Sequence, residues 1–163
     1  TTEFFQALEK ACKANDVVLI LDEVQSGYGR SGKFFAFQHH GINPDIVTTA
    51  KGMGNGFPIG GVLISPKFKA SYGLLGTTFG GSHLACAAAI AVLDVMESKN
   101  LMENANKVSE YFFEAIKVIP EIIKVKGRGL MLGVEFDFDV SALRKKMIIE
   151  KHILKVKTTI NRV

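Results

Sequence analysis

Hydrophobic positions along this 163-residue chain recur with two periods, one typical of amphipathic helices and one of buried strands. Helical spacing, in which apolar residues return every three or four positions, covers residues 2–14, 83–98 and 101–119. Mainly apolar segments, which are typical of buried strands, predict strands over residues 17–22, 46–50 and 60–65. Helices that alternate with such strands predict an α/β layer in which both faces of the sheet are covered.

The pattern changes after Pro120, which ends the last of these helices. A hairpin, a short helix and a strand are expected, in that order, over residues 122–138, 140–150 and 153–160. We therefore expect a partial large α/β domain over residues 1–120, followed by a partial C-terminal α+β domain over residues 121–163.

Composition narrows the class of protein. Hydrophobic residues make up 47% of the chain, which is enough for a packed core. The longest apolar stretch, residues 84–93, is half of the roughly 20 residues that a membrane-spanning helix needs, so no membrane is expected as a partner. The net charge is +4, and positive charge is concentrated after residue 116. Its densest cluster, residues 144–146, lacks the interleaved aromatic side chains that stack on bases, so nucleic acid is not expected either.

Two further features bear on the protein's context. Cys12 and Cys86 lie far apart in the sequence without a short-range partner, which favours free thiols in a reducing cytoplasm. The chain begins with Thr1 instead of an initiator methionine and opens directly into a helical pattern. We expect it to be a piece of a longer protein.

The main candidate chemistry is at the ends of two predicted strands. Lys51 stands between the apolar run 46–50 and a glycine-dense loop, GMGNG, and Asp22 ends an earlier run of five apolar residues. An amine and a carboxylate presented in this way are the two groups that pyridoxal phosphate needs. The amine forms a Schiff base, and the carboxylate keeps a proton on the pyridine nitrogen so that the ring accepts electrons. Taken alone, a lysine such as Lys51 is more often a loop residue that caps a strand, and Arg30 could hold Asp22 in a structural ion pair.

Residues 27–32 match the G-x-G-x-x-G fingerprint of dinucleotide-binding domains. That fingerprint needs a helix that starts within the motif and an acidic residue that ends the next strand. Here Gly41 and Pro44 cut short any helix that follows, and Asp45 opens the next strand instead of ending it. A nicotinamide-dinucleotide-binding α/β domain remains the alternative to a pyridoxal-phosphate site.

A third candidate precedes the second helical pattern. Thr77 and Thr78, followed by residues 79–81, provide hydroxyls and backbone amides just before a helix start. Such groups suit a phosphate as well as an ordinary N-cap turn. His83 and Cys86 are three positions apart, but no third ligand candidate is nearby, so no metal is expected.

Three segments in combination resemble the class III aminotransferases, a family of fold-type I enzymes that depend on pyridoxal phosphate. They are LDEVQSGYGRSGKFFAF at residues 21–37, NPDIVTTAKGMGNGFPIGG at residues 43–61 and TTFGGSHLACAAAIAVL at residues 77–93. The resemblance spans residues 1–150 and is closest to the acetylornithine/succinylornithine branch. Ornithine, 4-aminobutyrate and ω-amino acid aminotransferases share the same sequence segments, with different residues at some positions. The resemblance implies part of the fold-type I large domain and a small α+β C-terminal piece.

The resemblance also implies roles for individual residues. Lys51 is expected to be the Schiff-base lysine, and Asp22 the partner of the pyridine nitrogen. Val24 is expected to pack on the ring and Gln25 to bond its phenolic oxygen, while Glu23 belongs to the same cofactor-binding block.

The remaining implied roles concern a second subunit and the substrates. Thr78 is expected to reach the cofactor phosphate of the neighbouring subunit in a homodimer, and Thr77 to border the substrate. The implied reaction transfers the amino group of N-acetylornithine, or a related ω-amine, to 2-oxoglutarate. It follows a ping-pong Schiff-base mechanism and serves arginine biosynthesis in the cytoplasm.

The sequence also departs from the family. The family's upstream half carries the main phosphate-binding loop, an aromatic residue stacked on the ring and an arginine for the substrate carboxylate, and these residues have no counterpart here. Residues 151–163 do not match the family pattern, so no role is assigned to Arg162. A truncated, non-catalytic remnant without turnover is therefore a further alternative.

Overall fold

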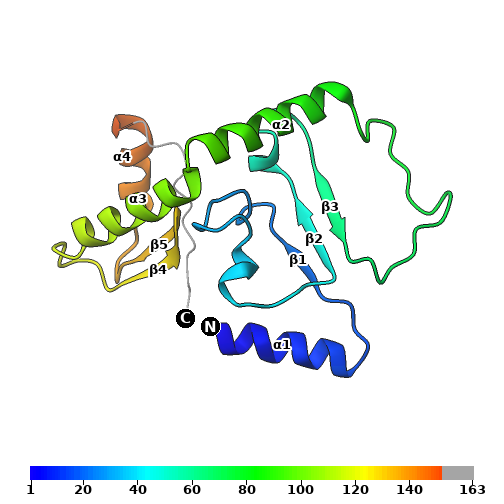
Figure 1. Ribbon diagram of the computed structural model, residues 1–163. Coiled ribbons are helices and arrows are strands. Elements are labelled where there is room, and N and C mark those ends of the chain that lie inside the picture. The colour runs from blue at the N-terminus through cyan, green and yellow to red at the C-terminus, as the bar shows by residue number, and fades with distance from the viewer. Residues whose placement is uncertain (152–163) are drawn as a thin grey trace.

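The computed structural model describes residues 1–151, in which strands form two separate sheets (Figure 1). The first sheet has three strands in the order β1 (Ile20–Asp22), β2 (Ile46–Thr49) and β3 (Gly61–Ile64). β1 runs parallel to β2, with Asp22 level with Thr48, whereas β3 runs antiparallel to β2, with Gly61 opposite Thr49. The predicted α/β character is confirmed, but the sheet is mixed and its strands are shorter than the apolar runs in the sequence.

The buried core of this sheet is small. Its members, each at most 8% exposed, are Leu19, Phe35, Ile42 and Val47. By contrast, the side chains of Ile20 and Val62 are 56% and 57% exposed. The expectation that both faces of the sheet are covered is therefore wrong for residues 1–151, because apolar strand side chains still meet solvent.

The first helix, α1 (Thr2–Ala14), has the predicted bounds and lies below the sheet in Figure 1. It begins where the Thr1 hydroxyl accepts a hydrogen bond from the backbone N–H of Phe4. The helix is tied to the segment before β2 through His40, whose ring stacks on Phe5 at 4.3 Å and lies 3.1 Å from the Thr2 hydroxyl.

Two helices follow the first sheet. α2 (His83–Ser98) has the predicted bounds, and α3 (Leu101–Ile116) ends three residues earlier than the predicted helix. Asn100 separates them in the left-handed conformation, at φ 48°, which asparagine tolerates better than most residues. In the described residues, no helix is both long and apolar enough to cross a membrane.

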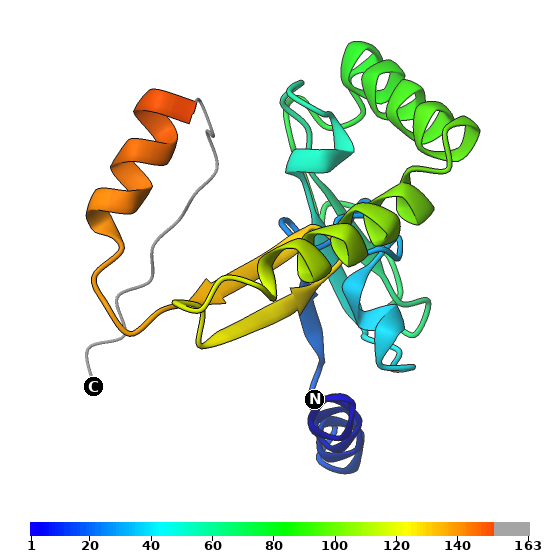
Figure 2. The same cartoon turned by 90° about the vertical axis from the view of Figure 1, so that its left-hand side faces the viewer.

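The second sheet is the predicted hairpin. β4 (Lys124–Arg128) pairs antiparallel with β5 (Met131–Glu135), and α4 (Ser141–Lys151) follows. α3 packs against β4 and crosses the hairpin in Figure 2. The strand predicted over residues 153–160 lies outside the described residues, and the domain boundary near residue 120 stays a prediction.

The turn of the hairpin packs against the glycine loop, residues 27–32. Leu130 N donates a 2.8 Å hydrogen bond to Arg30 O, and a Cβ added to Gly129 would lie 2.4 Å from the Ser31 carbonyl carbon. From α3, Asn106 Nδ2 donates a 3.2 Å hydrogen bond to Gly32 O. The C-terminal elements therefore contact the loop that follows β1 directly.

His39 forms a further hydrogen bond with the same glycine loop. It lies in the short 3₁₀ helix Ala36–His39, and its Nε2 is 2.9 Å from Ser31 O, so Nε2 carries the proton and donates it. Burial lowers the pKa of His39 below its ordinary value of 6.5. The positive charges of Arg128 and Lys33 act in the same direction, against the opposing effect of the Ser31 hydrogen bond.

This arrangement predicts a pH dependence of stability. A lowered pKa in the folded state means that the unfolded chain binds more protons below about pH 6.5, so the free energy of unfolding should decrease as the pH falls through that range. Denaturant unfolding at about pH 7.5 and about pH 5.5 measures this decrease. His39→Gln can still donate to Ser31 O but cannot titrate, so the unfolding free energy should depend less on pH in this variant. Part of the dependence should remain, because burial also lowers the pKa of His40. An unchanged pH slope in His39→Gln would contradict the assignment.

Candidate active site

The two residues chosen from the sequence lie at one edge of the first sheet. Asp22 is the last residue of β1, level with Thr48, and Lys51 follows the end of β2 by two residues. Because β1 and β2 are parallel, their carboxyl ends meet at the same edge, where ligands of α/β sheets bind. The structure thus places the carboxylate and the amine at adjoining strand ends, as predicted.

Asp22 presents a carboxylate that is only partly engaged. Its Oδ1 accepts a 2.9 Å hydrogen bond from Val24 N, and the residue is exposed. Among residues 1–151, no ion pair includes Asp22, so Arg30 is not its structural partner. An exposed carboxylate at the end of an apolar strand remains available to a cationic ligand.

Lys51 has an unusual backbone. It begins the 3₁₀ turn Lys51–Met53 at φ 41°, a left-handed conformation that few residues other than glycine, asparagine and aspartate adopt. Its carbonyl accepts from Asn55 N at 3.1 Å, which holds the turn, and its exposed side chain has no ion pair within the described part of the chain. Backbone strain of this kind clusters at functional sites, where the surrounding structure enforces it.

Tyr28 is a residue that the sequence analysis missed. It also has a positive φ, 54°, and a Cβ added to Gly52 would lie 3.0 Å from Tyr28 Cβ. Its ring packs on Phe34, with centroids 4.9 Å apart, and burial raises the pKa of its hydroxyl. Tyr28 therefore joins the loop after β1 to the turn that carries Lys51. A bulky residue between Gly27 and Gly29 was the signal in the sequence.

Glycines such as those after Lys51 can allow the backbone to approach a ligand closely. In the structure, two of them are crowded by the protein itself: Gly52 by Tyr28, and Gly54 by the Phe57 carbonyl, which would lie 2.2 Å from an added Cβ. Gly56, by contrast, has φ 113° and open space around it. The loop is therefore shaped by internal packing at least as much as by space for a ligand.

The three residues that follow Asp22 differ in how far they are exposed to solvent. Glu23 is 3% exposed, and its carboxylate accepts hydrogen bonds from Phe37 N, at 2.9 Å, and from the Ser26 hydroxyl. Val24 is half-buried, and Gln25 is exposed. The cofactor roles expected for these three residues stay predictions.

Thr77 and Thr78 lie in the long loop between β3 and α2, which extends away from the sheet in Figure 1. Both are exposed, and Thr78 lines a shallow hollow whose other residues are Phe79, Gly80, Gly81, Ser82 and His83. Within residues 1–151, neither side chain makes a hydrogen bond to the ends of β1 and β2. This position is compatible with a role toward a neighbouring subunit, which stays a prediction.

The geometry of residues 1–151 contains neither a metal-binding cluster nor the helix that a dinucleotide-binding fingerprint requires. Cys86 is a free, exposed thiol, and no cluster of three or more His, Cys, Asp or Glu side chains in residues 1–151 could hold a metal ion. The fingerprint at residues 27–32 opens no α-helix and is followed by a four-residue 3₁₀ helix. Its Gly32 packs against Asn106, whose Oδ1 would lie 1.8 Å from an added Cβ.

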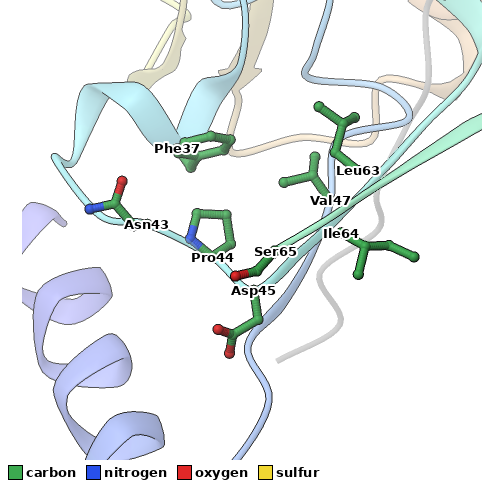
Figure 3. A pocket seen from close by; sticks show the side chains of 8 residues that line it. All are labelled: Phe37, Asn43, Pro44, Asp45, Val47, Leu63, Ile64 and Ser65. Carbon is green, nitrogen blue, oxygen red and sulfur yellow. The ribbon is translucent and has the colours of Figure 1, made fainter. Parts of the chain in front are cut away.

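A second hollow lies at the opposite end of the strands and is shown in Figure 3. Its lining residues are Phe37, Asn43, Pro44, Asp45, Val47, Leu63, Ile64 and Ser65. The one charged group there is already satisfied: Asp45 accepts from Leu19 N at 2.8 Å and pairs with Lys67 at 2.7 Å, and the Lys67 hydrogen bond lowers the pKa of Asp45. This hollow offers no reactive group.

An α/β sheet that presents an amine and a carboxylate at neighbouring strand ends is compatible with an enzyme that works with a pyridoxal-type cofactor. The sequence profile of the family Aminotransferase class-III matches residues 1–157. The chain belongs to the class III aminotransferases, as the resemblance of its three segments indicated.

Curated relatives agree with this assignment. The acetylornithine aminotransferase of Caldanaerobacter subterraneus subsp. tengcongensis is 41% identical over 160 residues, which are 94% of this chain and 40% of that protein. The acetylornithine aminotransferase of Aquifex aeolicus is 44% identical over 154 residues, 90% of this chain and 40% of that protein. The chain therefore spans about 40% of the length of these relatives.

Solved structures show the same fold. Plasmodium falciparum ornithine δ-aminotransferase matches with a TM-score of 0.80 at 30% identity, over 93% of this chain and 41% of that one. Toxoplasma gondii ornithine aminotransferase matches with a TM-score of 0.73 at 30% identity, over 82% of this chain and 33% of that one, and its structure is described with partial occupancy of PLP at the active site.

Proposed function

We propose that this chain is the lysine-bearing part of a pyridoxal-phosphate-dependent transaminase. The proposed reaction transfers the amino group of N-acetylornithine, or a related ω-amine, to 2-oxoglutarate in two half-reactions. The observation that carries the proposal is the placement of Asp22 and Lys51 at the carboxyl ends of adjacent parallel strands. The names of the curated relatives support the choice of the amino donor.

The side chains at this edge fit the cofactor. The exposed Lys51 amine has no ion-pair partner in residues 1–151, and Asp22 uses only Oδ1, toward Val24 N. A reactive amine and an anionic oxygen are thus both available, which is the donor set that an aldehyde-bearing pyridine requires. The exposed Gln25 and the half-buried Val24 follow directly and are proposed to line the ring.

Each residue has a proposed task. Lys51 Nζ would hold the cofactor through its aldehyde carbon, with loss of water, and, when displaced by the substrate amine, would move the proton from the amine-bearing carbon of the substrate to the cofactor. Asp22 would accept a hydrogen bond from the ring nitrogen and would keep that nitrogen protonated. When bound, the cofactor supplies an electron-accepting ring that stabilises negative charge on the substrate carbon.

A second subunit is part of the proposal. Thr77 and Thr78 lie on an exposed loop with several solvent-facing apolar side chains, among them Leu75 at 77% and Phe79 at 85% exposure. Apolar surface of this kind marks protein contacts. We propose that a homodimer covers the loop, with Thr78 directed to the phosphate of the partner's cofactor and Thr77 to the substrate.

The test uses a full-length chimera, because the chain spans only about 40% of its relatives. Residues 1–150 replace the matching segment of the Aquifex aeolicus relative, and the unaltered relative is the control. With N-acetylornithine and 2-oxoglutarate, the chimera should form glutamate. Without the oxo acid it should convert no more amine than there are active sites, as a two-step transfer requires.

Two outcomes would contradict the proposal. A chimera with the circular dichroism of the control that transfers no amino group would favour a non-catalytic remnant. Saturable binding of NADH at micromolar concentrations would favour the dinucleotide alternative.

A further inference from the structure

Glu23 carries a buried carboxylate that the proposed reaction does not use. It follows Asp22 directly, and its side chain turns into the loop after β1. One carboxylate oxygen accepts from Phe37 N at 2.9 Å, fourteen residues along the chain, and the other accepts from the Ser26 hydroxyl. Because Glu23 is only 3% exposed and both of its carboxylate oxygens are bonded within the loop, little of its surface is left to contact a ligand.

The backbone of Glu23 is engaged as well. Its N–H donates a 2.9 Å hydrogen bond to Thr48 O, which extends the pairing of β1 with β2 by one residue. Its carbonyl accepts a 2.9 Å hydrogen bond from Gly27 N, where an added Cβ would lie 2.8 Å from that carbonyl oxygen. Glu23 therefore joins the end of β1, the neighbouring strand and both ends of the following loop.

This arrangement fixes the residue that precedes Glu23. Successive side chains of a strand point to opposite faces, so a Glu23 held inward keeps Asp22 turned outward. The hydrogen bond from Val24 N to Asp22 Oδ1 also depends on the backbone path through residue 23. A shift of about 1 Å in a group that orients a cofactor is enough to weaken its function strongly.

We propose that Glu23 is a positioning residue, which aligns Asp22 toward the ring nitrogen through the 23–38 loop and does not touch the cofactor itself. The inference rests on the proposed function, since it assigns a role toward the same cofactor. It differs from the sequence-based expectation that Glu23 binds the cofactor, because both of its carboxylate oxygens serve the loop.

Two substitutions separate this role from a general loss of folding. Glu23→Gln keeps an oxygen acceptor for Phe37 N and an amide that can donate to the Ser26 hydroxyl, so it should preserve the loop. Glu23→Ala leaves both partners without their acceptor. Asp22→Asn is the control, because it weakens the proposed contact with the ring nitrogen but retains Oδ1 for Val24 N.

The first measurement does not involve the cofactor. Amide hydrogen exchange in the chain and in the chimera reports on the loop, and Glu23→Ala should speed exchange at Phe37 and Gly27. Glu23→Gln and Asp22→Asn should leave exchange at these amides close to that of the unaltered protein. The second measurement is the affinity of the chimera for pyridoxal phosphate and the pH titration of its bound-cofactor absorbance.

Glu23→Ala should weaken cofactor affinity about tenfold or more and shift the absorbance titration in the same direction as Asp22→Asn. Borohydride reduction should still attach the cofactor to Lys51 in this variant. Glu23→Gln should largely rescue both properties.

Unaltered affinity and absorbance in Glu23→Ala would overturn the inference. Weakened affinity without faster exchange at Phe37 and Gly27 would also overturn it, because Glu23 would then touch the cofactor. Equal damage in Glu23→Gln and Glu23→Ala would overturn it as well. If the unaltered chimera captured no cofactor, the proposed function would fail first, and the exchange data would show separately whether Glu23 holds the loop.

Discussion

Lys51→Ala is expected to abolish covalent capture of pyridoxal phosphate and amino-group transfer in the full-length chimera. The substitution removes both the amine that forms the link and the base that moves the substrate proton, so transfer should fall by about 10³-fold or more. Lys51 is exposed in a short 3₁₀ turn, so its substitution should leave the fold intact. Borohydride reduction followed by peptide mapping identifies the labelled lysine, and absorbance measures the bound cofactor.

Lys10→Ala is the matched control for this experiment. Lys10 lies exposed on α1, within the described residues it has no ion pair, and its removal should leave capture unchanged. Lys51→Arg keeps a positive charge but not an amine that adds to an aldehyde, so it should behave like Lys51→Ala. A borohydride-trapped adduct of undiminished yield in Lys51→Ala, at another lysine, would refute the assignment of this residue.

Gly129→Ala is expected to destabilise the chain by roughly 3 kcal/mol. Gly129 has φ 53°, and its added Cβ would lie 2.4 Å from the Ser31 carbonyl carbon and 2.6 Å from Gly32 N. These are backbone atoms, so the clash cannot be relieved by a change of rotamer, and the hairpin must separate from the glycine loop. The separation should break the hydrogen bond from Leu130 N to Arg30 O. Denaturant unfolding of the chain measures the loss.

Gly41→Ala separates the steric effect from backbone strain. Gly41 has a similar φ, 63°, but no heavy atom within 4 Å of an added Cβ. Its substitution should therefore cost only the strain of the left-handed conformation, about 1–2 kcal/mol. Equal destabilisation in the two variants would show that contact between the hairpin and the loop does not stabilise the chain.

The helices were the part of the fold that local sequence determined best. α1 and α2 have their predicted bounds because an apolar stripe and clear end signals, such as the break at Asn100, act within a few residues. The direction of β3 could not be predicted in the same way, since a buried strand has the same composition whether it pairs parallel or antiparallel. The strands also proved shorter, because pairing with a neighbour, and not apolar character, decides where a strand ends.

The site was predictable where it follows from strand ends. The placement of Asp22 and Lys51 at one edge of the sheet could be predicted, because a charged residue that follows an apolar run lies where the strand ends. The contact of Tyr28 with Gly52, and the bond from Phe37 N to Glu23, join residues that are 14 or more positions apart. No local pattern encodes such pairs. The three segments that resemble the class III aminotransferases pointed to the family without revealing these contacts.

The wedged turn of the β4–β5 hairpin has a practical consequence for anyone who labels this protein. Hairpin tips usually accept inserted peptides because they project into solvent. Residues 128–130 do not, since Gly129 is pressed against the backbone of residues 30–32.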